Sequence, residues 1–375
     1  MSTPSLPPDH ARGTRASNLP DVAPRLPTER GGVAVLGYGG IAASAHLPAY
    51  RQHGVGVVGV CGRPGRVEDV QQQFPFVGKV YRDADDLLDD PTVRVVDIAT
   101  GPDGRAELIR RSLAAGKHVL AQKPLTLDAA DLPVLEGLAR EASKLGLRVA
   151  VNHNARWAPP WRLANLLLRQ GRLGQVVGVT HVHDKALPPL TGTHFDRIEH
   201  MLLTDYLLHW VDITRFWLLD GSPAGQGEVC RVLALDSRLP GQPPGSLNPW
   251  SATIIMQARS GATASIRIPG SATASTPGCP FWVHGTEATL RGSVLLDSDR
   301  LSLDDGRSQQ ELPLTGAWFV DGFAGAMGEL LCAVAEDREP ENSLTQALGS
   351  LRLMFAARDS AERGGAPVDI EPPGA

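Results

Sequence analysis

Apolar and polar positions alternate in two different ways along this chain of 375 residues. From residue 31 to about residue 152, short apolar runs are separated by stretches with the spacing of a helix. Strands that alternate with helices form a parallel sheet covered on both faces. The first part of the chain is therefore predicted to be an α/β domain, a doubly wound parallel sheet of the Rossmann type over residues 31–152.

Within this domain, strands are expected at 33–36, 55–61, 79–81, 93–100, 118–122 and 147–151, with helices at 41–53, 106–115 and 129–145. Ligands of such sheets bind beyond the carboxyl ends of the strands. The residues that follow each strand are therefore the first place to look for a site.

After residue 152, the pattern changes to the alternation of strand and turn that is typical of antiparallel sheets. Strands are expected at 176–183, 229–235, 252–259, 262–268, 281–285 and 288–290, and helices at 159–169, 200–219, 319–335 and 345–362. Residues 153–375 are predicted to form a C-terminal α+β domain with a large, open, mainly antiparallel sheet. Residues 1–30 are rich in proline, serine and charge without apolar periodicity, and are predicted to be a disordered arm.

Composition narrows the class of protein. The chain is 42% hydrophobic and 21% charged, as ordinary globular proteins are. Its net charge of −5 favours neither nucleic acid nor a membrane surface as a partner. Cys61, Cys230, Cys279 and Cys332 lie far apart without a CxxC pair, which argues against a disulfide framework or a zinc knuckle and fits the reducing cytoplasm. No apolar run approaches the roughly 18 residues of a membrane span.

A glycine turn follows the first predicted strand, and Gly37, Gly39 and Ala42 have the GxGxxG/A spacing of dinucleotide-binding sites. Gly37 permits the tight turn and Gly39 allows a pyrophosphate to approach the backbone at the helix N-terminus. A bare glycine turn between a strand and a helix is the alternative. The predicted cofactor contacts of this turn are Gly37, Tyr38, Gly39, Gly40 and Ile41.

The end of the second predicted strand bears on the choice of cofactor. An NAD-preferring site usually has a carboxylate here for the ribose diol. This chain has Gly62 and Arg63 instead, with Arg66 nearby. Because a guanidinium can hold a 2′-phosphate bidentately, the predicted cofactor is NAD or NADP, with a lean toward NADP. A solvated loop arginine beside a site that accepts either cofactor remains the alternative.

Two further strand ends supply candidates. Thr100, Gly101 and Pro102 follow the fourth strand and are predicted to pass under the dinucleotide. The fifth strand leads into Gln122 and Lys123. A lysine at this position would be partly desolvated, which lowers its pKa and directs its ammonium into the site. Lys123 is therefore predicted to be catalytic, against the alternative of a solvated surface lysine.

The predicted helix at 200–219 is apolar nearly all round and therefore buried. It carries Asp205, His209 and Asp212 on one stripe at about 100° per residue. Ionisable groups on a buried helix are costly unless they pair or face a polar cleft. The stripe therefore marks a candidate site, with a core histidine satisfied by Asp205 as the alternative.

These motifs together resemble the Gfo/Idh/MocA family of sugar and inositol oxidoreductases. The resemblance rests on the glycine turn, the run Ala-Gly-Lys-His-Val-Leu at 115–120 that leads into Gln122-Lys123-Pro124, and Asn152-His153-Asn154 with Arg156. It extends to 285–287 and 359–362, and so covers nearly everything after the arm. The family usually has glutamate where this chain has Gln122. Its DxGxHxxD pattern matches Asp205, His209 and Asp212, with Leu207 in place of glycine, which is expected to reshape the pocket.

The resemblance implies a catalytic set of Lys123, Asp205 and His209 that moves hydride between a nicotinamide cofactor and a secondary alcohol or ketone of a sugar, inositol or sugar derivative. His209 is expected to be the base, Lys123 to hold the reacting oxygen, and Asp205 to orient the imidazole or a neighbouring hydroxyl. Gln122, Lys123 and Asn152 are expected to contact the cofactor. The expected substrate contacts are Lys123, Arg156, Trp157, Asp205 and His209. The family's sheet implies a homodimer or homotetramer.

Several alternatives stay open from sequence alone. One is a glycosidase that oxidises its sugar transiently with bound NAD, and another is a sensor without catalysis. A metal cluster of His181, His183, His194 and His200 has no recognisable ligand spacing, so no metal is predicted. Residues 239–249 are either a lid or a plain surface loop.

Overall fold

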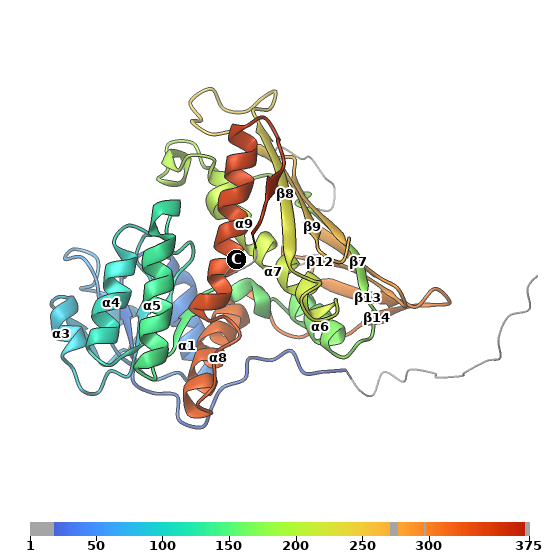
Figure 1. Cartoon of the computed structure of the whole chain (residues 1–375). Coiled ribbons are helices and arrows are strands. Elements are labelled where there is room, and N and C mark those ends of the chain that lie inside the picture. Colours follow the sequence, from blue (N-terminus) through green and yellow to red (C-terminus); the bar gives the residue numbers. More distant parts are fainter. Residues whose placement is uncertain (1–18, 271–276, 296–297, 372–375) are drawn as a thin grey trace, which may run out of the picture.

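The protein, seen in a computed structural model, consists of two sheets with helices packed against them (Figure 1). The structure describes residues 19–270, 277–295 and 298–371. The first sheet has six parallel strands in the order β3-β2-β1-β4-β5-β6. These strands are β1 (Val33–Leu36), β2 (Val57–Cys61), β3 (Lys79–Tyr81), β4 (Val95–Ile98), β5 (His118–Ala121) and β6 (Val149–Val151). The predicted Rossmann sheet is confirmed.

The second sheet has nine strands in the order β14-β13-β12-β11-β7-β10-β9-β8-β15. It is antiparallel except for the pair β7 and β10, so the predicted C-terminal α+β architecture is also confirmed. Its strands are β7 (Val176–Val182), β8 (Val229–Ser237), β9 (Ser251–Ala258), β10 (Thr263–Ile268), β11 (Cys279–Gly285), β12 (Thr289–Val294), β13 (Arg300–Asp304), β14 (Gln309–Leu312) and β15 (Val368–Asp369). The last three were not predicted as separate strands.

The α-helices are α1 (Leu47–His53), α2 (Val70–Gln73), α3 (Ala84–Leu88), α4 (Arg105–Ala114), α5 (Leu132–Lys144), α6 (Pro159–Arg169), α7 (Leu208–Asp220), α8 (Phe323–Ala335) and α9 (Leu344–Glu362). Short 3₁₀ segments are η3 (Ala129–Asp131), η4 (Asn154–Trp157) and η5 (Phe195–Arg197). Segments with π-helical bonding are η2 (Ala42–His46), η6 (Leu202–Tyr206) and η7 (Trp318–Gly322).

The two sheets differ in burial because they are covered differently. All four residues of β1 are buried, as they are in β4, since helices cover both faces of the parallel sheet. In β9, buried residues such as Ile254 and Met256 alternate with more exposed ones such as Ile255. Only one face of the second sheet therefore packs against the C-terminal core.

Helices α8 and α9 belong to the C-terminal part of the chain but cover the first sheet (Figure 1). Phe323 and Met327 of α8 join the core on one face, and Leu348 and Met354 of α9 join the core on the other. The apolar segment 318–335 is long enough to cross a membrane by composition, which the sequence reading did not anticipate. Since 78% of that segment is buried here, its apolar side chains serve the packing between the domains.

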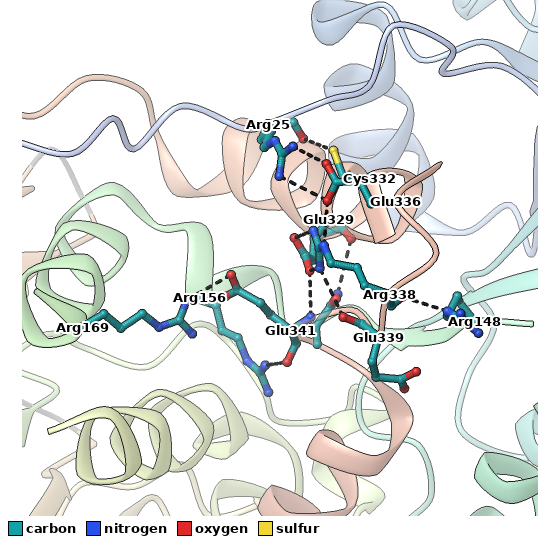
Figure 2. A network of polar contacts seen from close by, with 12 residues as sticks. Arg25, Arg148, Arg156, Arg169, Glu329, Cys332, Glu336, Arg338, Glu339 and Glu341 are labelled. Atoms are coloured by element: carbon teal, nitrogen blue, oxygen red, sulfur yellow. Dashed lines mark hydrogen bonds and ion pairs between the residues drawn. The ribbon is translucent and has the colours of Figure 1, made fainter. Parts of the chain in front are cut away.

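Part of the predicted N-terminal arm is folded against the rest of the chain. Residues 19–30 run past α8 without regular secondary structure, and Val22 is 8% exposed. Figure 2 shows Arg25 paired with Glu336, while a Cβ at Gly328 would collide with the Arg25 carbonyl. Disorder was therefore the wrong prediction for residues 19–30, and residues 1–18 lie outside the described part.

Candidate active site

Lys123 extends from the carboxyl end of β5 toward the C-terminal domain. Its Nζ donates hydrogen bonds to the backbone oxygen of Asp205 at 3.0 Å and to Oδ1 of Asp205 at 3.1 Å. The two side chains are 15% and 9% exposed. The fold thus joins two predicted catalytic residues from different domains in one ion pair that is still open to solvent.

The predicted helix at 200–219 is divided. The π-helical η6 ends at Tyr206, and α7 begins at Leu208. Because a π-helix has more residues per turn than an α-helix, a wheel at 100° per residue does not apply across this junction. Leu207 is fully buried in the C-terminal core, so it packs there and does not shape a pocket as expected.

His209 follows this junction on the first turn of α7. Its ring is half-buried and lies edge-on to Trp318, with 5.4 Å between the ring centroids. Burial and the nearby charge of Lys123 hold the pKa of His209 well below its ordinary value. The imidazole is therefore neutral at pH 7, as a proton acceptor must be. Within the described residues, its buried Nδ1 has no hydrogen-bond partner, so Asp205 does not orient the imidazole through this nitrogen, and the alternative role of Asp205 toward a neighbouring hydroxyl stays a prediction.

Asp212, the third member of the predicted stripe, is fully occupied by other partners. Arg156 donates to its two oxygens from Nε at 2.7 Å and Nη2 at 2.8 Å, and the Ser350 hydroxyl donates at 2.6 Å. Burial alone would raise the pKa of Asp212, but the Arg156 charge outweighs it and keeps that pKa below the ordinary value. The carboxylate is therefore a structural anchor between η4, α7 and α9.

Arg156 and Trp157 were expected to contact substrate, but both lie in the core. Arg156 is 3% exposed, and its Nη1 donates to the backbone oxygen of Glu341 at 2.6 Å (Figure 2). Trp157 is 4% exposed and packs against α8, where a Cβ at Gly325 would collide with its ring. The contacts of both side chains therefore serve the packing between the domains.

The sequence analysis did not assign a role to His153, which also lies at this site. Its Nδ1 is 3.6 Å from Oδ2 of Asp212. Burial, together with the charges of Arg156 and Lys123, lowers the pKa of His153 to about 4. His153 and His209 are therefore two neutral imidazoles close to one ammonium.

A second polar cluster lies beneath the glycine turn. His46, at the end of η2, is fully buried, and its Nδ1 is 2.7 Å from Oδ2 of Asp97. Its Nε2 is 3.1 Å from Nε2 of Gln122 and 3.3 Å from Nδ2 of Asn152. The two amides that were expected to contact the cofactor therefore point at His46. Sequence alone offered one signal for this cluster, since Asp97 is a lone carboxylate within a buried strand.

Arg105 connects two of the predicted strand ends. It is 1% exposed, and its guanidinium donates to the backbone oxygens of Thr100 and Pro124. Burial lowers the pKa of Arg105 to about 10, so the side chain stays charged. The ends of β4 and β5 are thereby held together beside Lys123, an interaction for which the sequence gave no signal.

The glycine turn has the shape that a dinucleotide requires. Gly37 has a φ of +109°, and a Cβ on it would meet the Thr100 backbone nitrogen at 2.8 Å. Gly39 and Gly40 are exposed, with no atom within 4 Å of the position a Cβ would take. The backbone is therefore open on the side where phosphates approach a helix N-terminus.

The remaining histidine candidates have different partners. His181 stacks on Trp217, His183 contacts the Tyr206 hydroxyl at 2.9 Å, and the other two lie against Phe195 and Asp236. Across residues 19–270, 277–295 and 298–371, no group of three or more potential ligands is placed to hold a metal ion.

The loop at 239–249 is held by Asp196, which accepts hydrogen bonds from the backbone nitrogens of Leu247 at 3.0 Å and Asn248 at 3.4 Å. Its C-terminal end is therefore attached to η5.

Comparison with known proteins identifies the class. Residues 32–153 match the oxidoreductase family with an NAD-binding Rossmann fold, and residues 166–370 match the family's C-terminal alpha/beta domain. The chain belongs to the Gfo/Idh/MocA family of oxidoreductases.

Two relatives show how the similarity is distributed. A D-apiose dehydrogenase of Paraburkholderia graminis is 26% identical over 332 residues, which are 85% of this chain and 84% of the relative. A 1,5-anhydro-D-fructose reductase of Ensifer adhaerens is 26% identical over 303 residues, 79% and 85% of the two chains. Among solved structures, an oxidoreductase from Agrobacterium radiobacter in complex with NAD+, L-tartaric acid and magnesium has a TM-score of 0.77, with 22% identity and 91% and 98% coverage.

Proposed function

We propose that this oxidoreductase transfers hydride between NAD or NADP and a secondary alcohol or ketone of a sugar, inositol or sugar derivative. The observation that carries the proposal is the Lys123–Asp205 pair, which lies beside the neutral His209 at the carboxyl edge of a dinucleotide-type sheet. The names of the relatives, a dehydrogenase of apiose and a reductase of anhydrofructose, support the substrate class.

Each residue of the site has a separate role in the proposed reaction. When bound, the nicotinamide ring supplies or accepts the hydride. His209 accepts the proton of the substrate hydroxyl, and Lys123 donates a hydrogen bond to the same oxygen, which stabilises alkoxide character. Asp205 holds the Lys123 ammonium with its carboxylate and its backbone oxygen. In the direction of reduction, the protonated imidazole returns its proton.

For the cofactor, we propose a preference for NADP. Arg63 and Arg66 are both exposed after β2, and neither forms an ion pair within the described part of the chain. The nearest acid downstream, Glu68, accepts a hydrogen bond from the Gly65 backbone at 2.5 Å. Two uncommitted guanidiniums are therefore available to a 2′-phosphate.

The preference is tested by kcat/KM for both cofactors in the double variant Arg63→Ala and Arg66→Ala. We expect kcat/KM for NADP to fall about tenfold or more, since charge-assisted bidentate hydrogen bonds are lost, while the value for NAD stays within about twofold. Arg82→Ala, a change at an exposed arginine that pairs with Asp83 and Asp86, is the control. Equal losses for the two cofactors would contradict the NADP preference.

We further propose a homodimer or homotetramer formed through the open face of the nine-stranded sheet. Leu235 of β8 is 55% exposed and Ile255 of β9 is 42% exposed on this face. Light scattering after gel filtration measures the assembly, and Ile255→Asp should release smaller species. A wild-type monomer would refute the proposed assembly.

The proposed location is the cytoplasm. The four free cysteines are compatible with its reducing environment.

The reaction itself is tested with a panel of sugars, sugar acids and cyclitols and with both cofactors, followed by reduced-nicotinamide absorbance. Net reduction of NAD or NADP by one class of substrate supports the proposal. Release of an aglycone from a glycoside without net cofactor change would indicate a glycosidase instead. Dinucleotide binding without any turnover, together with an unchanged biological role in His209→Ala, would indicate a sensor.

A further inference from the structure

In the buried cluster beneath the glycine turn, a carboxylate, an imidazole and two amides form a continuous chain of polar contacts. Asp97 and His46 are both 0% exposed, and Oδ2 of Asp97 lies 2.7 Å from Nδ1 of His46. The Tyr50 hydroxyl donates to the same Oδ2 at 2.6 Å. An ionised Asp97 can only accept, so Nδ1 of His46 carries a proton directed at it.

On the opposite side of the His46 ring, the backbone of Lys123 determines how the Gln122 amide is oriented. The Lys123 N–H donates to Oε1 of Gln122 at 2.8 Å, which fixes the amide of Gln122 in one orientation. Its NH₂ group then faces Nε2 of His46 at 3.1 Å, beside Nδ2 of Asn152 at 3.3 Å. Amide nitrogens donate and do not accept. Nε2 of His46 must therefore be without a proton.

We infer that His46 is a positioning residue, held as the neutral tautomer with its proton on Nδ1, and that its bare Nε2 orients Gln122 and thereby the backbone of Lys123. The inference rests on the proposed function, because it assigns His46 a role through Lys123. His46 is buried and acts only through other side chains. A proton on Nε2 would face the NH₂ groups of Gln122 and Asn152.

The charge of residue 122 determines how many protons the His46 ring carries. A glutamate has nearly the same shape as glutamine, and one of its oxygens could still accept from the Lys123 N–H. Its other oxygen would face Nε2 of His46 and require a donor there. Because Asp97 on the far side also favours a cationic ring, Gln122→Glu should place protons on both nitrogens of His46.

The proton positions are measured by nitrogen NMR of protein labelled with ¹⁵N in histidine rings. His46→Gln identifies the signals of His46 by their loss. We expect the wild type to show one bare and one protonated nitrogen near neutral pH, because the ring faces an acceptor at Nδ1 and an amide donor at Nε2. Gln122→Glu should show two protonated nitrogens near neutral pH. A doubly protonated His46 in the wild type, or a bare Nε2 in both proteins, would overturn the inference.

The kinetic arm separates positioning from packing. His46→Leu should lower kcat about tenfold to about a hundredfold, because small displacements of catalytic groups are costly, while KM for the substrate changes less than about threefold. His46→Gln keeps an acceptor and a donor and should recover part of the loss. A lower melting temperature with an unchanged kcat would mean that His46 contributes only to packing, and would overturn the inference.

A control at the first residue of β5 uses a second histidine, which is partly buried. Nδ1 of His118 accepts from the Arg148 backbone at 3.0 Å, far from the carboxyl edge. His118→Gln should leave kcat within about twofold, so a loss equal to that of His46→Leu would count against the inference. If no sugar or cyclitol supports turnover in the wild type, the proposed function fails, whereas the NMR arm still supports or overturns the tautomer.

Discussion

Two aspartates of one helical stretch, Asp205 in η6 and Asp212 in α7, each pair with a basic residue from another element, and the two pairs differ in how completely they are satisfied. Lys123 and Asp205 meet at 3.1 Å with side chains 15% and 9% exposed. Arg156 and Asp212 meet at 2.7 Å with side chains 4% and 2% exposed, and Ser350 occupies a further position on the carboxylate.

The difference separates a reactive pair from an anchoring pair. Within the part of the chain that the structure describes, the Lys123 ammonium donates to two oxygens of Asp205 and keeps one N–H for a ligand. The guanidinium of Arg156 uses Nε, Nη1 and Nη2 within the protein. A buried and saturated ion pair has no capacity left for a ligand, but breaking it leaves an uncompensated charge. The comparison therefore predicts that damage to the first pair appears in kcat and damage to the second in stability.

The largest expected effect comes from His209, which lies between the two aspartates in sequence. His209→Gln should lower kcat about 10²–10⁴-fold, because general-base catalysis is lost. The free energy of unfolding in urea should change by less than about 1 kcal/mol, since glutamine stays polar and no hydrogen bond to Nδ1 is removed. A variant with full kcat would break the comparison, because the site would then not depend on the base proposed for it.

Asp212→Ala should reduce the free energy of unfolding by about 3–5 kcal/mol, since Arg156 is left as a buried unpaired charge. Urea denaturation measures this loss. Asp220→Ala on the same helix is the control, because Asp220 and Arg169 are 25% and 33% exposed. Its loss should be at most about 1 kcal/mol. Combining Asp212→Leu with Arg156→Met should recover part of the stability, and a double variant no better than Asp212→Ala would refute the anchoring role.

Lys123→Met should lower kcat about 10²–10³-fold, as loss of one donor to a developing oxyanion does. The Lys123 charge is one cause of the lowered His209 pKa, so its removal should raise that pKa. Neutral His209 is the active form in oxidation, and activity is lost as the pH falls through its pKa. The acidic limb of kcat/KM should therefore lie below pH 6.5 in the wild type and move to higher pH in Lys123→Met. An unmoved limb would show that the two groups do not interact.

The smallest effect is expected at Ser350, the third partner of Asp212. Ser350→Ala removes one hydrogen bond to a charged group and should cost about 1.5–3 kcal/mol of unfolding free energy. Its kcat should stay within about threefold. A large loss of kcat at wild-type stability would mean that the Asp212 cluster takes part in the reaction.

Much of the fold was readable because its signals are local. Strands of the first sheet are apolar runs between helical patterns, and the observed β3 and α6 have the predicted bounds. The glycine turn and the lysine after β5 are short motifs whose position at a strand end follows from chain order. The predicted family is confirmed, since the motifs that carry it cover both domains.

The sequence alone determined a Rossmann sheet, an antiparallel sheet and a glycine turn. It also singled out a lysine, a histidine and two aspartates as candidate site residues. Only the tertiary structure decided which aspartate faces the lysine, because a π-helical segment changes the rotation between Asp205 and His209. It also withdrew Arg156 into an ion pair with Asp212 and brought His46 against Gln122. Such choices depend on side chains far apart in sequence, and burial decides them, because each buried polar atom must find its partner in the space the fold leaves.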